Sequence, residues 1–220
     1  MRALRPRSLV SLRKPRTRWL SGGLYVIGAY VAFAVLLTAV AVGLRGALPW
    51  AHPTPSWSLS PFAAAGWSVL LCAGIALVVI VFSRIASRRF DWAQRLADGL
   101  RPVASSFSAA EIVAVALASS VAEELLFRAV LVPWLGVVPA AIAFGLAHQM
   151  RGPSRFVWIA FSCVVGLGLG AVYASTGSLV GPILAHAAIN AVNLAWLKAG
   201  RSPDSLAPPA RPRDPLLSGA

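Results

Sequence analysis

Long apolar runs without a charged residue are the feature that most restricts how this chain can fold. The first runs from Gly23 to Leu44 and another from residue 61 to 83. A helix needs about 20 apolar residues to cross a bilayer. The runs are continuous rather than alternating, which disfavours a transmembrane barrel. Since only 12% of the 220 residues are charged, against about a quarter in soluble domains, we predict an all-α, polytopic transmembrane helical bundle.

About six spans are expected, near residues 23–44, 61–83, 108–133, 138–150, 156–175 and 178–197. The fourth is short and follows the third almost directly, so a re-entrant or tilted segment is the alternative there. Between the second and third spans, residues 84–101 are basic, and Phe90, Trp92 and Leu96 can share one helical face. This pattern predicts a short amphipathic helix on the membrane surface.

The net charge of +13 is concentrated in a few segments. Seven basic residues precede residue 19, five lie between Arg84 and Arg101, two are Arg151 and Arg155, and four lie between Lys198 and Arg213. Basic residues in alternate loops mark the cytoplasmic side of a membrane protein. We therefore expect a multi-pass protein of the cell (inner) membrane with both termini cytoplasmic. The basic segments would contact anionic lipid headgroups, and no basic groove with interleaved aromatic residues suggests nucleic acid.

The chain is expected to divide into four parts. These are a basic N-terminal segment (1–22), two spans with the amphipathic linker (23–104), a core that carries the polar motifs (105–197) and a disordered tail rich in Pro, Ser and Ala (198–220). Cys72 and Cys163 lie within apolar runs and are predicted to be core residues, not a disulfide. The glycine run 166–170 predicts close helix packing.

Three charged residues, Glu123, Glu124 and Arg128, interrupt the third span. Each costs about 2.5–3.5 kcal/mol near the centre of a bilayer on insertion scales. Glu124 and Arg128 are four residues apart in the favourable order, which predicts an ion pair on one helix face. Glu123 points about 100° away around the helix and has no local partner. It therefore needs partners from other spans.

Candidate partners occur in later spans: His148 after the fourth, and His186 with Asn190, four residues apart on one face of the sixth. Each has a purely structural interpretation, as an ion pair, a buried histidine or an asparagine that joins helices. Together, two carboxylates, two imidazoles and a carboxamide resemble an acid–base site with an anion-stabilising partner. An ion relay in a small transporter is an alternative, but the chain has no evident internal repeat.

These residues form three motifs in a fixed order. EELLFR (123–128) fits EExxxR, FGLAH (144–148) fits FxxxH and HAAIN (186–190) fits HxxxN. In this order they resemble the CPBP family of intramembrane proteases, which includes type II CAAX prenyl endopeptidases and bacterial proteins linked to bacteriocin processing or immunity. The resemblance covers about residues 105–197, the family's protease core. Ala129 stands where family members commonly have glycine, and the stretch between the first two motifs is short.

The resemblance implies an endopeptidase that cleaves a membrane-associated, lipidated or CAAX-like peptide or protein. Glu123 with His148 would activate water, His186 and Asn190 would stabilise the oxyanion, and Glu124 with Arg128 would support the site. No cofactor is expected. The alternative is a zinc enzyme that uses Glu123, His148 and His186 as ligands, although HExxH is absent and His186 would then leave the oxyanion role. A non-catalytic immunity or scaffold protein is the other alternative.

Overall fold

The computed structural model describes residues 22–150 and 152–200, and within these ranges the chain is helical and contains no strand. The predicted all-α transmembrane bundle is confirmed. The expected N-terminal segment, apart from Gly22, and the tail from residue 201 lie outside the described residues. In chain order the elements are α1 (Gly22–Arg45), α2 (Pro61–Arg89), α3 (Asp91–Ser106), α4 (Ala109–Glu124), η1 (Leu125–Leu131), α5 (Val132–Leu135), α6 (Val137–Ala147), α7 (Arg155–Thr176) and α8 (Val180–Ala199).

Four of the described helices, α1, α2, α7 and α8, are long and apolar enough to cross a membrane. The expected third span is present as α4, η1 and α5, which follow one another with helical backbone angles at their junctions. Its first part, α4, has only 16 residues and ends with Glu123 and Glu124. For this reason α4 is not among the helices that are long and apolar enough to cross a membrane by themselves. The expected order of the segments along the chain is preserved.

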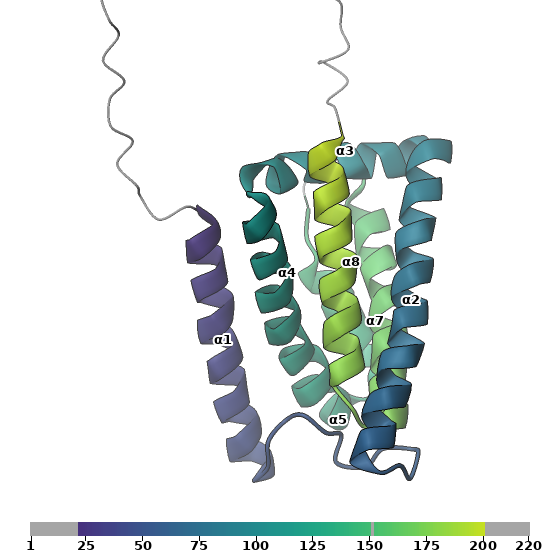
Figure 1. The fold of residues 1–220 in the computed structure, drawn as a ribbon. Helices are drawn as coiled ribbons and strands as arrows, with labels where there is room; N and C mark the ends of the chain where they lie inside the picture. Colours follow the sequence, from purple (N-terminus) through teal and green to yellow (C-terminus); the bar gives the residue numbers. More distant parts are fainter. Residues whose placement is uncertain (1–21, 151, 201–220) are drawn as a thin grey trace, which may run out of the picture.

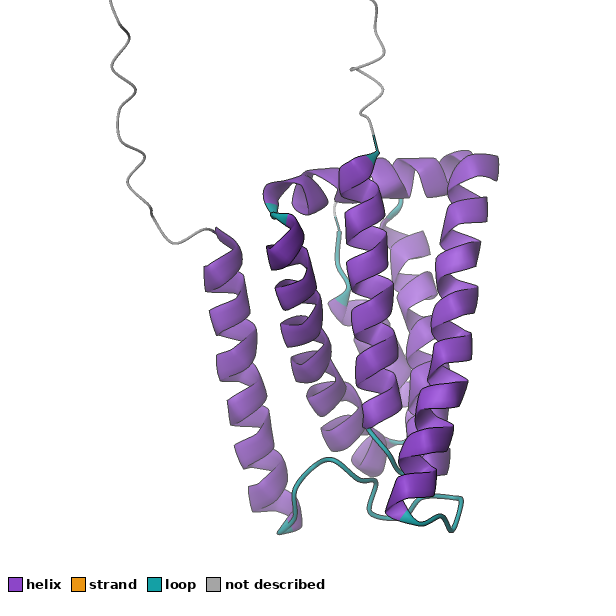
Figure 2. Ribbon diagram, in the orientation of Figure 1, coloured by secondary structure: helices purple, strands orange, loops and turns teal. Residues whose placement is uncertain are grey.

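The expected fourth span differs from the structure. Its helix, α6, has 11 residues, or about 16 Å at 1.5 Å per residue, roughly half of the hydrocarbon thickness. The chain after α6 continues as a loop (Figure 2) and reaches α3, because Met150 lies against Gly99. The helix is therefore shorter than the short span expected at 138–150, and its half length fits the re-entrant or tilted alternative. A half-length helix and a loop take the place of the expected span, and His148 lies at their junction.

In Figure 1, helices α2, α4, α7 and α8 run along the bundle, α1 flanks α4, and α3 lies across one end. The main helix contacts join α2 to α8, α6 to α7, α4 to α8 and α1 to α4. The predicted surface helix is α3, where the rings of Phe90 and Trp92 stack with centroids 6.0 Å apart. It begins later than expected because α2 continues to Arg89.

Most described basic residues gather at the α3 end of the bundle. They lie near the end of α2, along α3, at the start of α7 and at the end of α8: Arg84, Arg88, Arg89, Arg95, Arg101, Arg155 and Lys198. The start of α1 and the end of α8 lie at this end too (Figure 1). Arg45 ends α1 at the opposite end, and Arg128 lies within the bundle.

Glycines set the spacing between α6 and α7, as predicted from the glycine run. A Cβ added to Gly166 would lie 3.1 Å from the Phe144 ring, and one added to Gly170 would lie 3.1 Å from Val137. Across the same contact, a Cβ on Gly145 would lie 2.7 Å from the Ile159 carbonyl oxygen. The two described cysteines, Cys72 and Cys163, are free, as expected.

The start of α8 is fixed to α2 by a buried polar contact. The Ser68 hydroxyl donates to the Ser178 carbonyl (2.9 Å) and accepts from the Gly181 amide (3.2 Å). A Cβ on Gly181 would fall inside van der Waals contact with the Ser68 backbone carbonyl. Because that backbone belongs to a packed helix, it cannot move aside as the end of a flexible side chain could.

Gly181→Ala is therefore expected to destabilise the protein by about 1–3 kcal/mol, the usual cost of overpacking. The measurement is reversible unfolding in detergent micelles. The matched control is Gly74→Ala on α2, because a Cβ there meets no atom within 4 Å. Equal stability of both variants and the parent protein would contradict the tight α2–α8 crossing.

Candidate active site

Five of the six predicted site residues converge inside the bundle. Glu123 and Glu124 lie at the end of α4, Arg128 on η1, His148 directly after α6 and His186 on α8. The three motifs thus meet because α4 packs against α8, while η1 contacts α6. The short length of α6 matters here, because it ends inside the bundle and leaves His148 facing the carboxylates.

The predicted ion pair of Glu124 and Arg128 is present, with Nη1 and Oε1 3.0 Å apart. The same carboxylate oxygen accepts a hydrogen bond from Nδ1 of His186 at 2.8 Å. Both members of the pair are buried, with 0% and 1% of their surface exposed. A buried charge is tolerated only when it is paired. Glu124 is therefore occupied by two partners, one from its own helical segment and one from α8.

Arg128 is further enclosed by α6 and α7. Its Nη2 donates to the Gly166 carbonyl at 3.4 Å, and its Cζ lies 4.5 Å from the centre of the Phe144 ring. A guanidinium over an aromatic face is stabilised by the ring quadrupole. The same glycine packs against α6, where a Cβ would lie 3.1 Å from the Phe144 ring and 3.3 Å from Ala141.

The segment that carries Arg128 is a π-helix of seven residues, which the sequence did not indicate. Such turns are rare and occur frequently at functional sites. The Ala129 carbonyl in this turn accepts a hydrogen bond from Nη1 of Arg45 at 3.1 Å. Ala129 itself is fully buried. The bundle therefore accommodates the alanine side chain at position 129, where members of the family that the motifs resemble commonly have glycine.

Glu123 is the more accessible of the two carboxylates, with 18% of its side chain exposed. Its Oε2 lies 3.6 Å from Nε2 of His148 and 3.9 Å from Nε2 of His186. Both separations exceed the range of direct hydrogen bonds. Its other oxygen, Oε1, accepts from the Tyr30 hydroxyl at 3.4 Å. One oxygen of Glu123 therefore faces both histidines and the other faces α1.

The backbone and Glu124 determine which nitrogen of each histidine faces Glu123. Nδ1 of His148 lies 2.8 Å from the Phe144 carbonyl, which can only accept, so Nδ1 carries the proton. Nδ1 of His186 likewise donates to the Glu124 carboxylate. The Nε2 atoms of both rings are left to face Glu123. The Phe144 ring packs against both imidazoles, with centroids 4.4 and 5.6 Å away.

Asn190 lies one turn beyond His186 on α8 and is half-buried. Among the residues that the structure describes, none forms a hydrogen bond with its carboxamide. Asn193, the next polar residue of that helix, accepts a hydrogen bond from Nη1 of Arg84 at 2.8 Å and joins α8 to α2. The helix therefore places Asn190 beside the site without tying it to a structural partner.

Tyr30 is the site contact that sequence reasoning missed. It comes from α1, which carries no motif, and the only signal was a hydroxyl in the middle of an otherwise apolar run. Within residues 22–150 and 152–200, no three His, Cys, Asp or Glu side chains are grouped as metal ligands would be.

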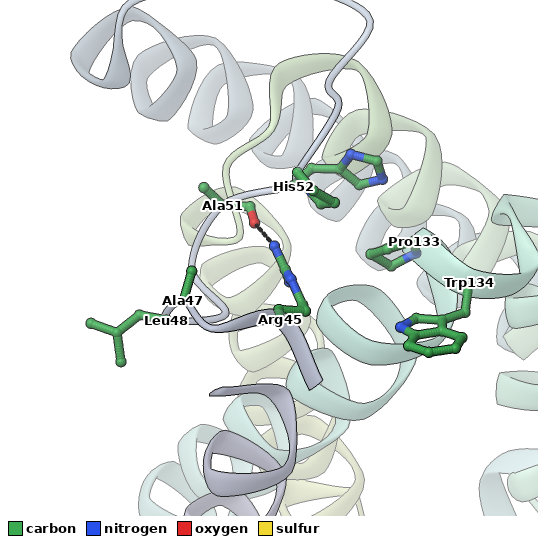
Figure 3. Close-up of a pocket in the computed structure, with 8 residues that line it drawn as sticks. Arg45, Ala47, Leu48, Ala51, His52, Pro133 and Trp134 are labelled. Carbon is green, nitrogen blue, oxygen red and sulfur yellow. Dashed lines mark hydrogen bonds between the residues drawn. The ribbon is translucent and has the colours of Figure 1, made fainter. Parts of the chain in front are cut away.

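Two cavities lie away from these residues. Figure 3 shows the first, about 650 Å³, at the end opposite α3, where Arg45 donates to the Ala51 carbonyl at 2.6 Å beside His52 and Trp134. Burial, and secondly the Arg45 charge, lower the pKa of His52. The second is an apolar groove of about 680 Å³ between α2 and α7. Neither is lined by a predicted site residue, so neither marks the candidate active site.

Comparison with known proteins identifies one matching family. Residues 105–192 match the family described as type II CAAX prenyl endopeptidase Rce1-like. The matched range contains all six predicted site residues and leaves out α1 and α2. No curated protein and no solved structure matches the chain.

Proposed function

We propose that this membrane protein is an intramembrane endopeptidase whose water is activated by Glu123 and His148, since residues 105–192 match the family described as type II CAAX prenyl endopeptidase Rce1-like. The observation that carries the proposal is the placement of Glu123 Oε2, 3.6 and 3.9 Å from the Nε2 atoms of two histidines. The family supports a protease of the CAAX type in general. The geometry supports these residues as its acid–base groups.

In this mechanism, a water molecule binds between Glu123 Oε2 and His148 Nε2. Both atoms are acceptors, because the proton of His148 is held at Nδ1 by the Phe144 carbonyl. The water donates to both and attacks the peptide carbonyl with its oxygen lone pair. The proton it loses passes to the Glu123–His148 pair and then to the leaving amine. General acid–base catalysis of this kind contributes about 10²–10⁴-fold.

The tetrahedral oxyanion would be stabilised by His186 Nε2 and the Asn190 carboxamide, which lie on one face of α8. Glu124 accepts from Nδ1 of His186 and holds the ring with Nε2 toward the site, and a proton on each ring nitrogen would let Nε2 donate to the oxyanion. Arg128 fixes Glu124 in turn. Donors oriented in a site of low dielectric are effective because they need no reorganisation during the reaction.

The substrate is proposed to be a membrane-associated or lipidated peptide or protein. The site lies between helices that can span a membrane, so a substrate chain must approach from the bilayer or its surface. The basic α3 end is proposed to face the cytoplasm and anionic lipids of the cell (inner) membrane, and both termini are proposed to be cytoplasmic. The division into an N-terminal segment, two spans with a linker, a protease core and a tail remains part of this proposal.

The test is cleavage of membrane peptides by the purified protein in proteoliposomes. Peptides of one sequence, with and without a lipid chain on cysteine, are incubated and their fragments identified by mass spectrometry. We expect His148→Ala to lower turnover by about a hundredfold or more. The matched control, His52→Ala, alters a histidine of the opposite-end cavity and should keep full activity. Equal turnover by His148→Ala and the parent protein would overturn the mechanism.

The same assay separates the alternatives. We expect strong chelators to leave the activity unchanged, because the proposed chemistry uses only side chains and water. Loss on chelation with recovery on adding zinc would support the zinc enzyme instead. A folded protein that cleaves none of the peptides would favour a non-catalytic immunity or scaffold role.

A further inference from the structure

Helix α1 lies outside the family-matched range, yet it is fixed along α4 and η1 at several depths. Near its start, Gly23 lies so close to the Glu111 side chain that a Cβ would overlap it. Further along, Leu37 belongs to a buried cluster with Leu125 of η1. At its end, Arg45 donates to the Ala129 carbonyl of η1 at 3.1 Å. These contacts hold α1 in one register against the helix that carries Glu123.

Within that register, α1 presents Tyr30 to the site. The Tyr30 hydroxyl donates to Glu123 Oε1 at 3.4 Å, and the ring is half-buried between α1 and α4. Glu123 has no other side-chain hydrogen bond among the described residues, and its Oε2 is buried and without a hydrogen-bond partner. The carboxylate can rotate about its side-chain torsions unless one oxygen is held. Tyr30 is the group in contact with that oxygen.

We propose that Tyr30 is a positioning residue that holds Glu123 Oε1 and so directs Oε2 toward His148 and His186. The inference rests on the proposed function above and extends the site to α1. Tyr30 itself does not touch the reacting atoms. It acts through Glu123, by donating to Oε1 and so restricting the rotation of the carboxylate.

Four titratable or charged groups face Glu123 from the surrounding elements. They are Tyr30 from α1, Arg128 from η1, His148 after α6 and His186 from α8. Of these groups, Tyr30 contacts Oε1 and the two histidines face Oε2. Removal of the Tyr30 hydroxyl should therefore leave Oε1 without this donor, while the positions of the histidines beside Oε2 are unchanged.

The first test does not require substrate. Dicyclohexylcarbodiimide reacts with protonated carboxyl groups, so the pH at which Glu123 is half-labelled, measured by mass spectrometry, reports its protonation. In Tyr30→Phe we expect this pH to rise relative to the parent protein, because a donor to the charged form is lost. The matched control is Tyr25→Phe on the same helix, whose side chain is 62% exposed. Coincident labelling curves for Tyr30→Phe and the parent protein, or no labelling of Glu123 at any pH, would overturn the proposal.

The second test uses hydrolysis. Tyr30→Phe should lower kcat by about three- to tenfold, as loss of a modest hydrogen bond implies, with KM unchanged and the acidic limb of the pH profile at higher pH. Tyr25→Phe should match the parent protein. A fall in kcat without a shift in either pH curve would indicate a packing role and overturn the positioning role. If the parent protein hydrolyses no peptide, the proposed function fails and the labelling experiment still decides the role of Tyr30.

Discussion

Glu123→Gln is expected to lower kcat by about a hundredfold or more while the protein folds normally. The amide has nearly the same shape as the carboxylate and can still accept the Tyr30 hydroxyl bond at Oε1. It cannot take a proton from water, so the acid–base contribution of about 10²–10⁴-fold is lost. Steady-state hydrolysis in proteoliposomes, together with thermal unfolding of the same preparation, measures both expectations.

The matched control is Glu111→Gln, which makes the same substitution at the start of α4. Glu111 accepts from the Ser108 amide at 2.8 Å within a capping box, and glutamine serves in the same motif. Its activity should therefore equal that of the parent protein. If Glu123→Gln also retained full turnover, another group would have to activate the water, and the proposed mechanism would be wrong.

The chemical groups of the site could be predicted from the sequence more fully than their arrangement in space. Spacing alone predicted the Glu124–Arg128 pair, because residues four apart face each other on any α-helix. It also left Glu123 without a local partner. Spacing could not predict that His186 and Arg128 would both contact the same oxygen of Glu124. That arrangement depends on how α8 packs against α4.

The features that the sequence did not predict, namely the short α6, the π-turn and the Tyr30 contact, also depend on how the helices pack. Hydropathy predicted a fourth apolar segment but cannot report that its helix ends after 11 residues. The π-turn of η1 is joined to α1 by the Arg45–Ala129 bond, and the spacing of residues does not predict a contact between residues so far apart in sequence. Tyr30 belongs to a helix without motif residues, and an aromatic residue in a membrane span is commonly only part of its apolar surface. Its contact with Glu123 depends on the packing of α1 against α4.

The largest effect on stability is expected from Arg128→Met. Methionine fills most of the arginine volume but leaves Glu124, with 0% of its surface exposed, without its cation. Removal of one member of a buried ion pair costs about 3–5 kcal/mol, because the remaining charge stays buried and uncompensated. Denaturant unfolding in detergent micelles should show this loss. The control is Arg155→Met at the start of α7, where the side chain is exposed and a change within about 0.5 kcal/mol is expected.

The double variant Glu124→Gln with Arg128→Met distinguishes loss of a charge pair from loss of packing. If the uncompensated carboxylate causes the instability, its replacement by a neutral amide should restore most of the free energy of unfolding, although the amide leaves His186 with a weaker partner. If the guanidinium contacts with Gly166 and Phe144 dominate, the double variant should be as unstable as Arg128→Met. Only the first result agrees with Glu124 and Arg128 neutralising each other inside the membrane and leaving Glu123 as the carboxylate available for catalysis.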